Sequence, residues 1–176
     1  MSNITNETKA IFATLQDSFE TAIADQGLGQ LGEWPEKGEH ACYVLSMEVK
    51  PGQFRQTDDK QMFPALSVQF FYQLCEDPDR TEPLIWNGAP MVIPNDADAL
   101  THDGSKTRAK IELERLKGCI QTLVGRKPGN LGNDLEEIEN KLNSDNTVAC
   151  MVYCQYNQRG DGPTYKSEKL KNLLSV

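Results

Sequence analysis

The sequence lacks any long apolar segment. No apolar run approaches the roughly 18 residues that a membrane-spanning helix needs, and residues 1–9 contain neither the basic region nor the apolar core of a secretory signal. These absences predict a cytoplasmic protein without a membrane anchor. With 176 residues and 38% hydrophobic side chains, the chain has enough apolar surface for one folded domain with additions.

Recognisable catalytic patterns are also lacking. The chain has two histidines and no G-x-S-x-G motif, and the G-x-G-x-x-G match at Gly27–Gly32 follows an expected helix instead of a strand. Asp96, Asp98 and Asp103 leave open a metal-dependent enzyme, but they do not have the spacing of a calcium loop. We therefore expect a protein that is not an enzyme and that binds no metal and no cofactor.

The five cysteines form neither a metal motif nor an even-numbered disulfide set. They lie mostly in apolar segments, which favours reduced, buried thiols over a disulfide framework. On a strand, Cys150 and Cys154 would lie about 13 Å apart, too far to share a zinc ion. Structural cysteines are therefore the expectation.

Positive charge is scarce in the first part of the chain. The net charge is −8, and residues 1–100 hold 6 Lys and Arg against 16 Asp and Glu, whereas residues 101–176 hold 12 against 10. This balance argues against a nucleic-acid binder that relies on a large positive field. It is compatible with a local basic stripe, and also with an alternative function in which an acidic accessory protein binds a protein partner.

Hydrophobic periodicity predicts three helices, at residues 3–25, 106–124 and 134–142. In the first of these helices, one face is formed by Phe12, Leu15, Phe19 and Ile23. Strands are expected at 39–50, 63–74 and 147–156 and in the tail 165–176, and residues 83–94 are expected to form one bent strand or a tight pair.

Alternation assigns faces to the first two predicted strands. In the first strand, Tyr43, Leu45, Met47 and Val49 are expected to share one face. In the second strand, the apolar face is expected to consist of Leu66, Val68, Phe70, Tyr72 and Leu74. Phe71 is an exception, because it is an aromatic residue on the polar face.

This order of elements predicts an α+β fold. We expect a five-stranded Greek-key, OB-like barrel with an inserted helix and an extra N-terminal helix. The alternative is a flat antiparallel sheet backed by two helices. The expected division is an N-terminal helix with a Gly-rich linker, residues 1–37, and an OB-like single-strand-binding domain, residues 38–176.

Nucleic-acid contact is the function with most support, because basic and aromatic residues coincide in the two loops that wall an OB groove. The candidate residues are Lys50, Phe54, Arg55, Lys60, Phe71, Trp86, Arg159 and Lys166. The alternative for each is structural: the phenylalanines cover a helix and the cations solubilise the surface. A second basic cluster at 106–117 contains interleaved glutamates, so local ion pairs are the favoured interpretation there.

The layout from residue 38 to 176 resembles phage-encoded single-stranded-DNA-binding proteins of the OB-fold type. The similar segments are Gly38–Lys50, Leu113–Gly125, Val148–Tyr156 and Tyr165–Leu174. The resemblance implies a protein that coats single strands in replication or recombination, with single-stranded DNA and a replication or recombination protein as partners. The sequence leaves open whether copies of the chain associate with one another. Many such proteins end in an acidic tail, whereas this chain ends Lys-Asn-Leu-Leu-Ser-Val.

Overall fold

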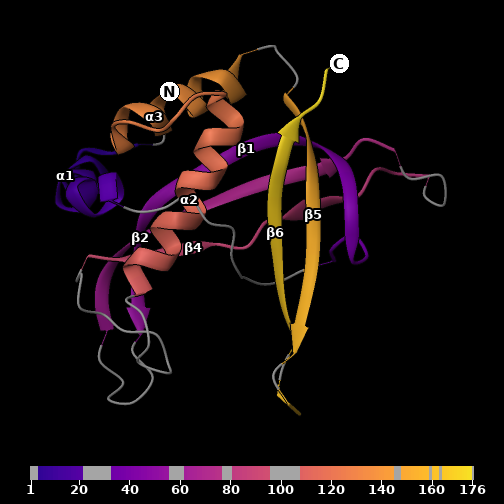
Figure 1. Cartoon of the computed structure of the whole chain (residues 1–176), viewed down its shortest axis with the longest axis horizontal. Helices are drawn as coiled ribbons and strands as arrows, with labels where there is room; N and C mark the ends of the chain where they lie inside the picture. The colour runs from indigo at the N-terminus through magenta and orange to yellow at the C-terminus, as the bar shows by residue number, and fades with distance from the viewer. Residues whose placement is uncertain are drawn as a thin grey trace.

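The computed structural model describes residues 4–21, 33–55, 62–76, 81–95, 108–144, 148–158, 160–162 and 164–175. These residues form three helices and one six-stranded antiparallel sheet, so the predicted α+β class is confirmed (Figure 1). The elements are α1 (Asn6–Thr21), β1 (Gly38–Arg55), β2 (Met62–Leu74), β3 (Ile85–Asn87), β4 (Met91–Pro94), α2 (Arg108–Val124), α3 (Leu131–Asn143), β5 (Val148–Gln158) and β6 (Thr164–Leu173).

The sheet is open, with the strand order β3-β2-β1-β5-β6 and with β4 also paired to β2. Residues 85–87 of β3 lie opposite residues 71–73 of β2, and residues 91–94 of β4 lie opposite residues 65–68. β3 and β4 are therefore two parts of one interrupted edge strand, which confirms the bent-strand interpretation. Within the described residues no ladder joins this edge to β6, so the expected five-stranded barrel is replaced by an open six-stranded sheet.

A β-bulge in β1 changes which of its side chains are buried. Val44 lies opposite Tyr72 and Ser46 lies opposite Phe71, so Leu45 is an extra residue on β1. Val44 is buried, whereas Leu45 is 40% exposed. The prediction that Tyr43 and Leu45 share the buried face was wrong, because one inserted residue reverses the alternation of the residues before it.

All three helices pack on one face of the sheet, which we call the inner face. The core there includes Phe12, Leu15 and Phe19 of α1, as predicted, together with the inner-facing side chains of the strands. α2 packs against both β4 and β6 and so covers the opening between the two sheet edges (Figure 1). Among the described helices, none combines the length and apolarity needed to cross a membrane.

Candidate nucleic-acid interface

The opposite face of the sheet, which we call the outer face, carries polar and aromatic side chains on β1, β2, β3, β5 and β6. Strand registers place these residues on it: Tyr43, Ser46, Glu48 and Lys50 of β1, Gln69, Phe71 and Gln73 of β2, Ile85 and Asn87 of β3, Met151, Tyr153 and Gln155 of β5, and Lys169 of β6. Half-buried aromatic and polar residues on one side of an antiparallel sheet are typical of a solvated face. Such a face can offer flat rings to a ligand.

Phe71 lies in the middle of the part formed by β1, β2 and β3. Its cross-strand neighbours are Ser46 and Asn87, both exposed, and its own ring is half-buried. Gln69, two residues away on the same face, donates a hydrogen bond from its side-chain amide to the Gly88 carbonyl at 2.8 Å. The ring is therefore surrounded by small or amide side chains that leave part of it accessible. These amides can also donate and accept hydrogen bonds at base edges.

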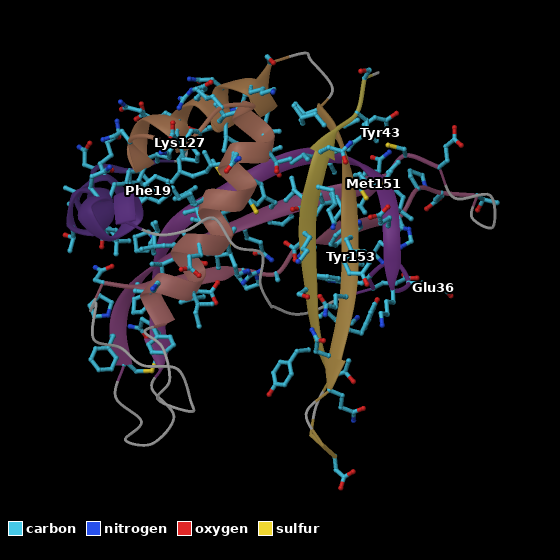
Figure 2. The ribbon with its side chains drawn as sticks, viewed as in Figure 1. Phe19, Glu36, Tyr43, Lys127, Met151 and Tyr153 are labelled. Carbon is cyan, nitrogen blue, oxygen red and sulfur yellow. The ribbon has the colours of Figure 1, made fainter. Side chains whose placement is uncertain are left out.

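A second aromatic group lies on the β5–β6 hairpin. Tyr153 lies opposite Lys169, and the Lys171 ammonium is 5.7 Å from the centroid of the Tyr153 ring. This distance is within the range of a cation–π interaction. Figure 2 labels Met151 and Tyr153 along β5, with Tyr43 near the same end of the sheet.

Sequence reasoning missed Tyr153, Lys169 and Lys171. A signal was present, because lysines recur at alternate positions in β6 and an aromatic residue occupies an outer position in β5. What the sequence alone does not show is the register that brings them together.

The structure brings three predicted residues to one face of the β1–β2 ladder. Lys50 is exposed, with its ammonium 2.7 Å from the Glu48 carboxylate, and Phe54 is half-buried opposite Phe63. Both alternate in register with Phe71, so all three lie on the outer face. The Lys50–Glu48 pair is a surface ion pair, which leaves the lysine able to exchange partners.

Lys166 lies on the other side of the sheet. It is opposite Tyr156, with its ammonium 5.6 Å from the centroid of the Tyr156 ring, and its register matches that of buried Cys154. Lys166 and Phe71 therefore do not share a face.

Trp86 does not lie on the outer face either. It is 2% exposed, with its ring stacked at 4.5 Å on Tyr72 and tilted at 4.7 Å against Trp34. Its pairing opposite Tyr72 directs it into the core. A ring enclosed in this way has no face for a nucleotide base, so Trp86 is not part of the candidate interface.

Some predicted positions lie outside the described residues. They are Lys60, Arg159, the Arg55 side chain, the Gly27–Gly32 segment, and the Asp96, Asp98 and Asp103 loop. Arg55 itself ends β1.

Two basic residues of α2, Arg115 and Lys117, have structural roles, whereas Lys110 is exposed. Arg115 is buried and forms a 2.8 Å ion pair with buried Glu112, as the ion-pair interpretation predicted. Lys117 is also buried and donates a hydrogen bond to the Phe19 carbonyl at 3.0 Å. Lys117 thus links α2 to α1, the Arg115 pair lies within α2, and neither cation is available to a phosphate.

Three of the five cysteines are buried in the core, as predicted for structural thiols. All five are free of disulfide bonds, and Cys42, Cys150 and Cys154 are fully buried. Burial raises the pKa of Cys42 to about 12 and also raises the pKa of Cys150 and Cys154. Neutral thiols are poor metal ligands. In the described part of the chain, no group of three His, Cys, Asp or Glu side chains is placed to hold a metal ion.

No protein-family model, curated protein sequence or solved structure matches this chain. Its function is therefore inferred from the chemistry of the outer face and from the strand order.

Proposed function

We propose that this protein binds single-stranded DNA, without catalysis and with tolerance of sequence, along the outer face of its sheet. The observation that carries the proposal is the Lys171 ammonium over the Tyr153 ring, on the same face as Phe71. Proteins of this kind combine aromatic rings for base stacking with cations for the phosphate backbone. Lys50 and Lys169 add two cations on that face.

The strand order supports an OB-type fold for this function. If β3 and β4 count as one interrupted strand, the order is third-second-first-fourth-fifth, with helices between the third and the fourth strands. β1 is long, bears a bulge and pairs with both β2 and β5. We propose that the sheet is an opened barrel of this type, in which α2 covers the opening. OB folds bind oligonucleotides on the face of their second and third strands and with two of their loops.

The net charge of −8 limits how binding can work. Because the overall field repels phosphate, affinity has to come from a few local phosphate contacts and from stacking. The outer side of β6 carries Lys169 and Lys171, and the one glutamate of this strand, Glu168, is buried. The exposed surface of this strand is therefore locally basic.

A coating role in replication or recombination fits such a protein, and it would act in the cytoplasm, or in the host cytoplasm if the chain is phage-encoded. Single-stranded DNA is its proposed ligand. A replication or recombination protein, or a second copy of the chain, would be its protein partner.

Fluorescence anisotropy of a labelled 30-nucleotide single strand tests the proposal, measured at two salt concentrations with a duplex of the same sequence as the control. The proposal predicts binding to the single strand that weakens as salt rises, and much weaker binding to the duplex. Absence of single-strand binding at low salt would contradict it. That result would favour the alternative, an acidic accessory protein that binds a protein partner. The alternative rests on the excess of acidic residues in 1–100.

A further inference from the structure

A cavity of about 290 Å³ lies at the end of the outer face where β2 ends and β5 begins. Its floor includes Ala41 of β1, Ala149 of β5 and Cys75, which directly follows β2 and donates its backbone N–H to the Ala41 carbonyl. These three side chains are small, so the sheet surface is hollow there. Tyr43 forms a wall, and Glu76 and Ser175 also line the cavity. Small-molecule sites usually measure roughly 300–1,000 Å³, so this cavity suits a single small group.

The aromatic wall lies beside Cys75. This neighbouring thiol raises the pKa of Tyr43, so Tyr43 is a neutral phenol. The His40 ring, also in the lining, is positioned by its Nε2, which donates to the Glu36 carbonyl at 2.7 Å. A preformed pocket with one aromatic wall suits a flat ligand.

The charge of the lining excludes a phosphate as the group held inside. The described lining residues include no lysine or arginine, and they include the carboxylate of Glu76, which is exposed at the rim. A carboxylate repels phosphate but accepts hydrogen bonds from amino groups. In nucleic acids, exocyclic amino groups occur on cytosine, adenine and guanine and are absent from thymine.

We infer that this cavity binds one unpaired nucleobase with an exocyclic amino group, which packs on Tyr43 and donates to the Glu76 carboxylate. The inference rests on the proposed function, since it assigns base selectivity to one end of the proposed DNA-binding face. The sugar and phosphate would then lie outside the cavity. It predicts a preference for cytosine over thymine within otherwise sequence-tolerant binding.

The test compares labelled homopolymers dC15 and dT15 by fluorescence anisotropy at one salt concentration. These pyrimidines are similar in size but differ in the amino group that Glu76 would accept. We expect dC15 to bind about fivefold tighter, at the low end of what one hydrogen-bonded base contact discriminates. In Glu76→Ala, the two affinities should come within twofold. In Glu7→Ala, which removes the same charge from an exposed position on α1, the preference should persist.

Tyr43→Ala should weaken both homopolymers, while Tyr43→Phe should preserve binding because the ring remains. Glu76 is exposed, so Glu76→Ala keeps the test decisive even if Tyr43→Ala fails to fold. Equal wild-type affinities, or a preference that survives Glu76→Ala, would overturn the base pocket while leaving the proposed DNA binding intact. Absence of binding to both homopolymers would instead overturn the proposed function and the pocket with it.

Discussion

Both carboxylate oxygens of Glu168 lie within hydrogen-bond distance of the backbone N–H of Ala89, at 3.1 and 3.0 Å. Glu168 belongs to β6 at one edge of the sheet, and Ala89 lies between β3 and β4 at the other edge. α2 covers the opening between these edges and contributes Arg115, whose charge faces Glu168. A buried side chain thus joins two edges that no described strand ladder joins.

The first prediction concerns the pH dependence of stability. Burial raises the pKa of Glu168, opposed by Arg115 and by the Ala89 hydrogen bond, while Glu112 adds to the rise. Because the folded pKa exceeds the unfolded one, folding disfavours the ionised form, and stability is gained as pH falls through the folded pKa. Relative to Glu168→Gln, which cannot bind this proton, the wild type should gain free energy of unfolding as the pH is lowered from neutral toward the ordinary titration range of a glutamate carboxyl. Urea unfolding at several pH values measures this difference, and a difference that does not vary with pH would contradict it.

The second prediction concerns the glycine beneath this contact. A Cβ on Gly88 would lie 2.6 Å from the Glu168 carboxylate, 2.7 Å from the Tyr72 ring and 2.9 Å from the Phe70 carbonyl. Gly88→Ala should therefore lower the free energy of unfolding by about 1–3 kcal/mol. Gly129→Ala is the matched control, because a Cβ there meets no atom within 4 Å. Chemical denaturation measures the free energy of unfolding of both variants. Equal values would show that the β3–β4 connection shifts to accommodate the added Cβ at little cost.

The third prediction tests the buried cation of α2. Arg115→Leu would remove the positive charge that Arg115 places beside Glu112 and Glu168, both of which are buried. Loss of one member of a buried ion pair costs about 3–5 kcal/mol. Lys9→Leu breaks the 3.0 Å ion pair with Glu136, in which both side chains are about half exposed, and should cost at most about 1 kcal/mol. Thermal melts of the two variants separate these cases, and similar losses would argue against a structural role for Arg115.

The fourth prediction tests stacking on the outer face. Phe71→Leu retains an apolar side chain but removes the aromatic ring, whereas Phe71→Tyr keeps the ring. The leucine variant should lose about 1–3 kcal/mol of single-strand binding free energy, the usual value for one stacked base. Anisotropy titrations with the same oligonucleotide give the comparison. Unchanged affinity in Phe71→Leu would remove the β2 part of the outer face from the interface.

The fifth prediction tests the phosphate contacts. Lys171→Ala should weaken single-strand binding and reduce the slope of log affinity against log salt by about 0.7, the value for one phosphate contact on a single strand. Lys127→Ala removes the same charge from an exposed site beside α3, away from the β5–β6 hairpin (Figure 2). Its slope should equal that of the wild type. Equal slopes for both variants would show that Lys171 contacts no phosphate.

Much of the fold was predictable from local sequence. In β2, Leu66, Val68, Phe70, Tyr72 and Leu74 are all buried, as their alternation predicted, and Phe71 lies on the other face. In β1 the same reasoning was wrong for Tyr43 and Leu45. A bulge is set by how two strands pair, and nothing in the apolar pattern of β1 alone indicated it.

The candidate interface was predictable only in part. Phe71 was identified because an aromatic residue interrupts a polar face. Trp86 was misplaced because a three-residue strand shows no periodicity of its own, and its direction follows from the pairing with Tyr72. Tyr153 and Lys171 were missed because they meet only after β5 and β6 pair in register.

By itself the sequence determined the kinds of elements and most of their inner faces, because 3.6-residue and two-residue periodicities arise from side chains within one segment. The tertiary structure decided the strand order, the open sheet and the burial of Arg115, Lys117 and Glu168. The contact between Glu168 and Ala89 joins positions 79 residues apart. Whether a charged side chain is buried, and which residue pairs or hydrogen-bonds with it, depends on segments that meet only when the chain has folded.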